Sequence, residues 1–409
     1  MDKELGTNPA SSPDESYTDG SNRPTARVRR LRRQSLEAVP SISTERAVLM
    51  TEFYQEETGM LSAPVRRAMA FRHLMKHKTV CILDGELIVG EKGPAPKATP
   101  TFPELCCHSL QDFDILDSRE KTPFTAGEAA KREQVETVIP FWEGRSMRDL
   151  ILAEMRPEWH AAYEAGVFTE FMEQRSPGHT VLDDKIYRKG MLDFIADIDA
   201  ALADLDYVED PQAYARQEQL KAMRITAEAI ITLGKRHAEE ARRQATAIND
   251  PVRKAELEEI ARVCEKVPAS KPDSFHEALQ YYWFVHLGVT CELNPWDAFN
   301  PGKLDQHLFP YYQRETADGT LTRAKAEELL HCFWIKFNNQ PAPPKVGVTA
   351  AESGTYTDFA QINTGGVKPD GSDAVNEVTY LLLDVIEDMR LLQPSSSCQL
   401  SKKNPDRFM

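Results

Sequence analysis

An arginine and a histidine four residues apart form the part of this sequence best suited to bind an anion. They lie in the segment Glu173–His179, whose Ser-Pro-Gly stretch marks a loop between two helices. Arg175 offers a planar fork of donors that fits a tetrahedral oxyanion, and His179 can donate or accept a hydrogen bond near neutral pH. The alternative is structural, with a helix-terminal arginine and a loop histidine bound to backbone groups. The two residues alone leave both interpretations open.

Other polar residues have structural explanations that outweigh a chemical role. Asp117 and Arg119 predict a salt bridge that fixes a loop rather than a contact with substrate. We also expect Asp305, in the segment KLDQHLFP, to have a structural role. Asn363 precedes Gly365-Gly366, which let backbone approach closely, either beside a cavity or within a barrel strand.

Seven cysteines are spread through the 409 residues without the spacing of a disulfide framework, which predicts free thiols in a reducing cytoplasm. Cys106-Cys107-His108 has no second ligand pair at the short spacings of a zinc site, so we expect no bound metal.

The net charge of −15 argues against nucleic acid and against an anionic membrane as partners, because both would repel the chain. The sequence contains no run of about 18 apolar residues that would predict a membrane span, and its N-terminus lacks the apolar core of a signal peptide. These features favour a cytoplasmic protein.

Two regions differ in composition. Residues 1–25 are rich in Ser, Thr, Asp, Asn and Pro and predict a disordered tail. Residues 26–409 form one continuous domain that starts with an arginine-rich run, 27–33, which we interpret as a solvated helix face rather than a nucleic-acid patch. Two short β-branched runs, 79–83 and 86–90, predict strands on either side of an Asp-Gly turn.

Helices dominate the remainder. Hydroxyl and carboxylate side chains three residues apart predict helix starts at Thr125, Ser146 and Ser274. Apolar periodicity and proline positions predict further helices over 186–205, 211–249, from Asp250-Pro251 onward, 322–336 and 372–392, with a strand at 395–401. Many helices with few short strands favour an α/β fold in which helices wrap a small sheet.

Three prolines, Pro341, Pro343 and Pro344, predict that residues 338–340 lie in an irregular loop after the helix. A plain surface connection is the alternative. Four segments of the sequence, the proline loop among them, carry a family resemblance. They are WIKFNNQPAPPKVGVTAAESGTYTDFAQINTGG (334–366), SFHEALQYYWFVHL (274–287), NPGKLDQHLFPYY (300–312) and LLQPSSSCQLSKKNPDRF (391–408). Together they resemble the glycyl radical enzymes of the pyruvate formate-lyase superfamily, from about Ser43 to Met409. The resemblance is strongest to members that cleave carbon–sulfur bonds of hydroxyalkylsulfonates, the isethionate and dihydroxypropanesulfonate sulfite-lyases.

The resemblance implies a ten-stranded α/β barrel made of two five-stranded halves. This chain would supply the N-terminal helical shell and the first half of the barrel. The family's Gly-Cys-x-Glu cysteine loop and its terminal glycine loop are not found in the sequence, so we expect no catalytic residue in this chain. Asn404-Pro405 would make a helix start, yet only a few residues follow it. We therefore expect the N-terminal half of a longer chain, inactive alone.

The family's chemistry implies a thiyl radical that abstracts hydrogen from the carbon bearing a hydroxyl group. No cofactor would be bound. A glycyl radical would be installed by an activating enzyme that uses S-adenosylmethionine and an iron–sulfur cluster, and the full-length enzyme would be a homodimer. Aromatic side chains could line the cavity and exclude water from the radical, although aromatic residues more often belong to the hydrophobic core. The candidates are Trp283, Phe284, Trp296 and Phe359.

The resemblance also suggests a substrate. In the isethionate enzymes the corresponding loop resembles Arg-x-x-x-Gln; here Arg175 is kept and His179 stands at the glutamine's place. A histidine there resembles the diol-using members, so we expect 2,3-dihydroxypropane-1-sulfonate, cleaved to sulfite and a carbonyl product. Alternatives are a glycyl radical diol dehydratase or C–N lyase of the glycerol or choline type, and a noncatalytic remnant of such an enzyme.

Overall fold

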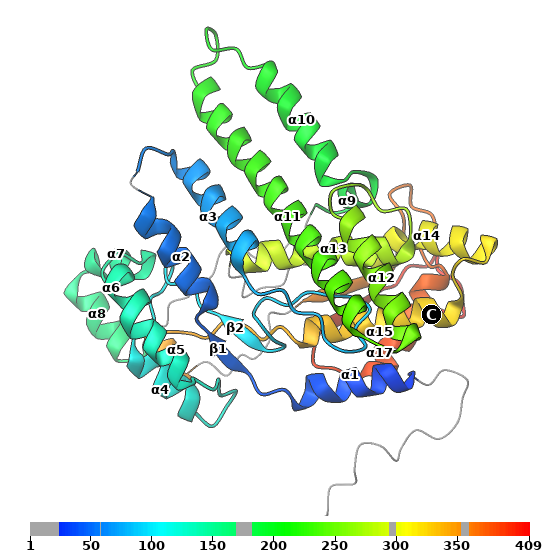
Figure 1. Ribbon diagram of the computed structural model, residues 1–409, viewed down its shortest axis with the longest axis horizontal. Coiled ribbons are helices and arrows are strands. Elements are labelled where there is room, and N and C mark those ends of the chain that lie inside the picture. The colour runs from blue at the N-terminus through cyan, green and yellow to red at the C-terminus, as the bar shows by residue number, and fades with distance from the viewer. Residues whose placement is uncertain (1–23, 58, 169–181, 294–299, 353–359) are drawn as a thin grey trace, which may run out of the picture.

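The computed structural model describes residues 24–57, 59–168, 182–293, 300–352 and 360–409 (Figure 1). Its strands are β1 (Ser41–Ser43), β2 (Ala98–Pro100), β3 (Gln361–Gly365) and β4 (Ser395–Gln399). Its helices are α1 (Ala26–Glu37), α2 (Glu45–Glu56), α3 (Ala63–His77), α4 (Leu110–Ser118), α5 (Glu128–Glu133), the π-helical turn η1 (Gln134–Val138), α6 (Ile139–Trp142), α7 (Met147–Ala153), α8 (Pro157–Glu164), α9 (Lys185–Arg188), α10 (Met191–Ala203), α11 (Ala213–Ala247), α12 (Pro251–Lys266), α13 (Phe275–Leu293), α14 (Leu304–Asp318), α15 (Arg323–Asn338), α16 (Gly347–Glu352) and α17 (Glu377–Met389).

Helices α13 and α15 form the centre of the main core. In α13 every residue from Glu277 to Gly288 is buried, including the aromatic run 281–284. A helix that is buried on all sides must be covered by neighbours all round, here α11, α12, α14 and α15. Helix α15 is buried from Leu329 to Asn338 and contacts α1 and α17 on its far side.

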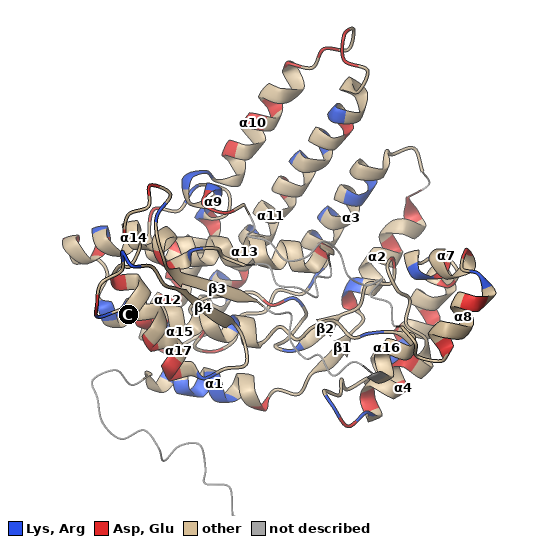
Figure 2. Ribbon diagram, turned by 180° about the vertical axis from the view of Figure 1, so that it is seen from behind, with Lys and Arg blue, Asp and Glu red and all other residues tan. Residues whose placement is uncertain are grey.

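A helical arm projects from this body. Helix α11, 35 residues long, packs along α3, α10 and α12, and the hairpin of α10 and α11 extends well past the other elements (Figures 1 and 2). Small residues, chiefly alanines, line the buried side of α11 and allow this close packing.

The strands form two parallel pairs. β1 pairs with β2, and β3 pairs with β4 in a register that runs from Gln361 opposite Ser395 to Gly365 opposite Gln399 (Figure 2). The helical shell expected from the sequence is confirmed, and the described strands form two-stranded sheets within it.

Helix starts that depend on local caps are confirmed at three positions. Ser146 Oγ accepts from the backbone N–H of Asp149 at 3.1 Å, and Ser274 Oγ accepts from that of Glu277 at 3.2 Å. The Asp250 carboxylate accepts from the N–H of Val252 at 2.9 Å, with Pro251 in the first turn of α12. The arginine-rich run 27–33 forms α1 as expected.

The expected hairpin at 79–90 is wrong. Only the turn at Asp84-Gly85 is present, and neither flanking run forms a strand. Side chains of neighbouring helices take the place of a partner strand. Gln280 bonds both the N–H and the carbonyl of Val89, at 2.9 and 3.0 Å, and Trp283 Nε1 donates to the carbonyl of Gly90 at 2.9 Å.

Several helix boundaries also differ from expectation. The helix over 186–205 is broken at Gly190, which is extended, because the N–H groups of Met191 and Leu192 donate to the carbonyls of Pro268 and Ala269 at 2.8 and 3.0 Å. Helix α5 begins at Glu128 rather than Thr125, whose backbone pairs with Pro40 and Ile42. Helix α17 begins at Glu377, capped by Asn376 rather than by residue 372.

Two further expectations near prolines are corrected. Asn338 is the last residue of α15 rather than part of the irregular loop. Asn404 does not cap a helix; its Nδ2 donates to the carbonyl of Gly366 at 2.7 Å, and a turn follows it. Of the predicted tail, residues 1–25, the first 23 residues lie outside the described residues. The tail therefore stays a prediction.

Candidate functional site

The two residues expected to bind substrate, Arg175 and His179, lie in the segment 169–181, outside the described residues. Trp296 and Phe359 also lie outside them. The structure therefore describes what surrounds these segments in the chain, and the roles of Arg175 and His179 remain predictions.

The other two aromatic candidates belong to the core. Trp283 is fully buried and stacks on the imidazole of His286, with ring centroids 4.9 Å apart. Phe284 packs against the imidazole of His237, with ring centroids 5.0 Å apart. Burial lowers the pKa of both histidines to about 3, so both are neutral members of the core.

Residues that flank the undescribed segments are close to one another. The phenol oxygen of Tyr163, whose ring lies 5.9 Å from that of Phe168, accepts from the N–H of Val348 in α16 at 3.1 Å. On the other side, Asn300 Oδ1 accepts from the N–H of Gln361, the first residue of β3, at 2.8 Å. Phe168 is thus linked through Tyr163 to α16, and Asn300 is linked to the first residue of β3.

An apolar cavity of about 1320 Å³ lies between α3, α10, α11 and α13. Phe71, Phe194 and Ile230 contribute to its walls. Leu182 and Leu293 line it as well, and they directly follow segment 169–181 and directly precede segment 294–299. This apolar cavity therefore lies beside described residues that adjoin the segments 169–181 and 294–299 in the chain.

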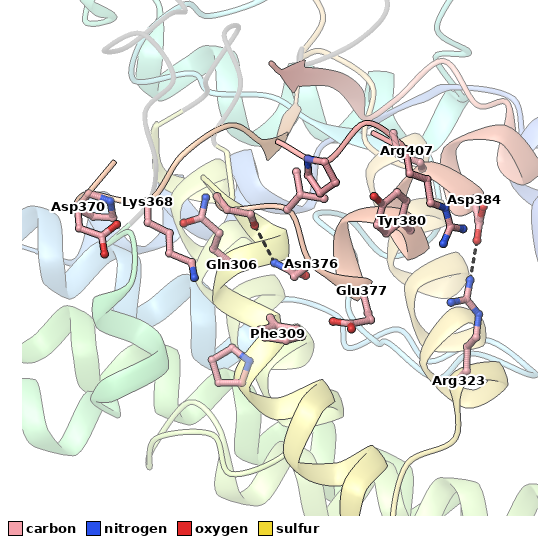
Figure 3. Close-up of a pocket in the computed structure, with 16 residues that line it drawn as sticks. Gln306, Phe309, Arg323, Lys368, Asp370, Asn376, Glu377, Tyr380, Asp384 and Arg407 are labelled. Atoms are coloured by element: carbon pink, nitrogen blue, oxygen red, sulfur yellow. Dashed lines mark hydrogen bonds and ion pairs between the residues drawn. The ribbon is translucent and has the colours of Figure 1, made fainter. Parts of the chain in front are cut away.

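A second pocket, of about 990 Å³, opens at the surface between α14, α17 and the segment 405–407 (Figure 3). Apolar side chains and charged side chains of both signs line this pocket. Arg323 pairs with Asp384 at 2.7 Å, and the Arg407 guanidinium lies over the Tyr380 ring at 4.7 Å. With no excess of either charge, the pocket gives no indication of a charged ligand.

The proline loop is buried rather than a surface connection, and it is held by an ionic network. Lys336 Nζ donates to the carboxylates of Glu86 and Glu91, the latter at 2.7 Å. Asn339 Nδ2 donates to Glu91 at 2.9 Å, and Gln340 Nε2 donates to the other Glu91 oxygen. Burial opposes the charge of Lys336, but the two carboxylates outweigh it and raise its pKa. The sequence analysis missed this network, although a lysine within the apolar stretch 329–337 was a visible signal.

Asp305 is structural, as expected, and it positions the end of β3. Its carboxylate accepts from the N–H of Gly365 and from Thr379 Oγ1, both at 2.7 Å, and burial raises its pKa. Gly365 and Gly366 have φ of +73° and +74°. They allow the close approach that the sequence suggested.

Arg119 fixes its loop through carbonyl groups rather than through the expected contact with Asp117. It donates to Ala350 at 2.7 Å and to Thr122 at 2.8 Å, which joins the end of α4 to α16. Cys107 has a pKa raised to about 12 by burial, and His108 Nε2 lies 3.2 Å from the carbonyl of Pro344. None of the seven cysteines forms a disulfide bond in the described structure, and within the described ranges no three His, Cys, Asp or Glu side chains are placed to hold a metal ion.

Comparison with known proteins places this architecture in a family. Residues 18–409 match the family described as pyruvate formate lyase-like. The chain belongs to the pyruvate formate lyase-like family. A glycyl radical enzyme of that fold from Archaeoglobus fulgidus superimposes with a TM-score of 0.83 and 28% identity, over 93% of this chain and 49% of the other.

Relatives of this pyruvate formate lyase-like chain differ in substrate. It is 55% identical over 383 residues to trans-4-hydroxy-L-proline dehydratase of Clostridioides difficile, covering 94% of this chain and 48% of the relative. It is 31% identical over 389 residues to isethionate sulfite-lyase of Oleidesulfovibrio alaskensis, covering 90% and 46%. The crystal structure of the C. difficile hydroxyproline dehydratase with substrate bound superimposes with a TM-score of 0.90 at 54% identity, over 94% of this chain and 49% of that one. The chain therefore spans about half the length of the relatives it matches. None of its described helices is long and apolar enough to cross a membrane.

Replacing Gly365 with alanine tests the close approach at the end of β3. A Cβ at Gly365 would lie 2.8 Å from the carbonyl oxygen of Gln399 and 2.5 Å from the Phe408 ring, whereas Gly371, at φ +79°, has no atom within 4 Å. We expect Gly371→Ala to lower the free energy of unfolding by about 1 kcal/mol through backbone strain alone. Gly365→Ala should cost roughly 1–3 kcal/mol more, because the clash adds to the strain. Urea denaturation of both variants measures the difference, and equal losses would contradict the packing argument.

Proposed function

We propose that this chain forms part of a glycyl radical dehydratase that acts on a small hydroxylated amino acid of the trans-4-hydroxy-L-proline type. The observation that carries the proposal is the 55% identity to the C. difficile trans-4-hydroxy-L-proline dehydratase, against 31% to the isethionate sulfite-lyase, over similar lengths. The identity favours the dehydratase alternative over the sulfonate substrate that the loop 173–179 first suggested.

The chemistry of residues 175 and 179 is compatible with this substrate. A guanidinium fork binds a carboxylate as readily as a sulfonate, so Arg175 would hold the carboxylate of the amino acid. Loss of a hydroxyl group needs a proton, whereas loss of sulfite does not, and His179 would supply that proton to the departing oxygen.

The radical machinery would come from the other half of the relatives' length. The family implies a glycyl radical installed by an activating enzyme that uses S-adenosylmethionine. The thiyl cysteine and the radical glycine would lie in the part that this chain does not match, and the complete enzyme would be a homodimer.

A sulfonate lyase remains the second candidate function, because several isethionate sulfite-lyases match the chain at 29 to 31% identity. The two candidates make different products from different substrates, so one enzyme preparation can separate them.

The test joins residues 1–409 to the unmatched half of the C. difficile dehydratase and activates the chimera with the radical-installing enzyme. We expect the chimera to remove water from trans-4-hydroxy-L-proline, measured by mass spectrometry of the product. It should release little sulfite from isethionate or 2,3-dihydroxypropane-1-sulfonate, and the unactivated chimera is the control. Sulfite release without dehydration of hydroxyproline would reverse the order of the two candidates.

A further inference from the structure

Two histidines of α3 are neighbours in space and take no part in the sites described above. We propose that His73 and His77 bind a divalent transition-metal ion of the zinc type, with Glu52 of α2 as the third ligand. The ion would join α2 to α3, two helices that pack side by side (Figure 1). The proposal involves no residue of the candidate substrate loop, so it does not depend on the proposed function.

The two imidazoles lie next to each other on one helix. His73 and His77 are four residues apart, so one turn of α3 places both on the same face. Their ring centroids are 4.4 Å apart, and the ring planes are inclined at 38°. Two histidines at this spacing on a helix are the arrangement with which metalloproteases hold zinc.

A nitrogen of His73 is left without a hydrogen bond by the fold. Among the described residues no atom forms a hydrogen bond with its Nε2, although that nitrogen is buried. The carboxylate oxygen Oε2 of Glu52 lies 3.9 Å from it, which is beyond hydrogen-bond distance. A buried polar atom without a partner is unfavourable, and a metal ion between this nitrogen and the carboxylate would satisfy both.

The His73 ring is also held in position before any ion binds. Phe53 of α2 packs against it with ring centroids 6.0 Å apart, and His77 contacts it from its own helix. Its side chain is only 24% exposed. A ligand that is already ordered loses little conformational entropy on binding, which favours the metal-bound state.

The local charges favour a cation that is bound by a neutral imidazole. Burial of the ring and, after it, the neighbouring His77 lower the pKa of His73, so this ring is neutral at pH 7 and keeps a lone pair for a metal. Glu52 and Glu56 oppose that shift, because their carboxylates favour a positive charge at this position. The same carboxylates would attract a divalent ion.

The third ligand requires a side-chain rotation. Within the described part of the chain no three His, Cys, Asp or Glu side chains already surround one point. Glu52 can complete such a group, because its side chain is 50% exposed and its carboxylate already lies beside His73. Zinc bonds to nitrogen and carboxylate oxygen are about 2.0–2.2 Å long, and water can take the fourth position. Two imidazoles and one carboxylate suit Zn²⁺ better than Mg²⁺, which prefers oxygen ligands.

The test is a calorimetric titration of the 409-residue chain, purified without a histidine tag, with Zn²⁺. We expect one Zn²⁺ per chain and no comparable binding of Mg²⁺. His73→Gln and His77→Gln should each weaken Zn²⁺ binding at least tenfold, and Glu52→Gln should weaken it less. His160→Gln is the matched control, because His160 is a half-buried histidine whose Nε2 lies 2.9 Å from the carbonyl oxygen of Leu152. This variant should bind Zn²⁺ as the parent chain does.

Two measurements on the unmodified chain locate the ion independently of the variants. X-ray absorption of the Zn²⁺ complex should show two imidazole ligands and no sulfur, and Zn²⁺ should slow hydrogen exchange most in the peptides of α2 and α3. If a histidine variant fails to fold by circular dichroism, these two measurements still decide. The proposal would be overturned by an absence of Zn²⁺ binding, by sulfur among the ligands, by exchange that slows elsewhere, or by equal losses in His73→Gln and His160→Gln.

Discussion

Replacing Lys336 with methionine is expected to lower the free energy of unfolding by about 3–5 kcal/mol. Among the described residues, Lys336 is the only cation within hydrogen-bond distance of the carboxylates of Glu86 and Glu91, and both carboxylates are nearly inaccessible to water. Methionine fills a similar volume, so the loss reports the unpaired charges rather than a cavity. Because Glu91 also orders Asn339 and Gln340, the proline loop should loosen as well.

Urea denaturation of Lys336→Met and of a matched control, Lys325→Met, measures this effect. Lys325 lies on the same helix and pairs with Glu328 at 3.0 Å, but its side chain is 43% exposed. An exposed pair of this kind contributes at most about 1 kcal/mol. Similar losses in the two variants would show that the buried network contributes no more than a surface pair.

The sequence predicted most accurately the features that depend on neighbouring residues. Caps at Ser146, Ser274 and Asp250 form because a side chain bonds backbone groups two or three positions away, and such spacing is visible in the chain. The long amphipathic helices follow from periodicity for the same reason.

Features that depend on distant residues were not predictable in this way. The runs 79–83 and 86–90 have the composition of strands, yet the partners of their backbone are Arg253, Gln280 and Trp283 on helices far along the chain. The break at Gly190 likewise depends on hydrogen bonds to Pro268 and Ala269. Local preference favoured one structure, and long-range packing determined another.

The predictions for the candidate site also differ in how far the structure tests them. The structural roles of Asp305 and Trp283 are confirmed by their contacts, whereas Arg175 and His179 lie in 169–181, outside the described residues. The loop chemistry predicted an anion with an adjacent hydroxyl. It could not separate a sulfonate from a carboxylate, because a guanidinium binds both.

In the activated chimera, Arg175→Ala is expected to reduce kcat/KM for trans-4-hydroxy-L-proline by more than a hundredfold. This corresponds to a loss of about 3–5 kcal/mol in transition-state binding. A substrate carboxylate in a dry cavity would lose its charged partner. Arg216, an exposed arginine that pairs with Asp210 at 3.2 Å on the helical arm, provides the control. Arg216→Ala should leave kcat/KM unchanged.

His179→Gln separates the two candidate functions, because glutamine keeps a hydrogen bond but cannot deliver a proton. If water is the leaving group, kcat should fall by roughly a hundredfold or more, while KM changes little. If sulfite is the leaving group, no proton donor is needed, and the variant should instead shift preference from 2,3-dihydroxypropane-1-sulfonate toward isethionate. Steady-state kinetics with all three substrates measures both effects. Near-normal turnover by both Arg175→Ala and His179→Gln would mean that the two residues are structural, and the assignment of this loop to substrate binding would be wrong.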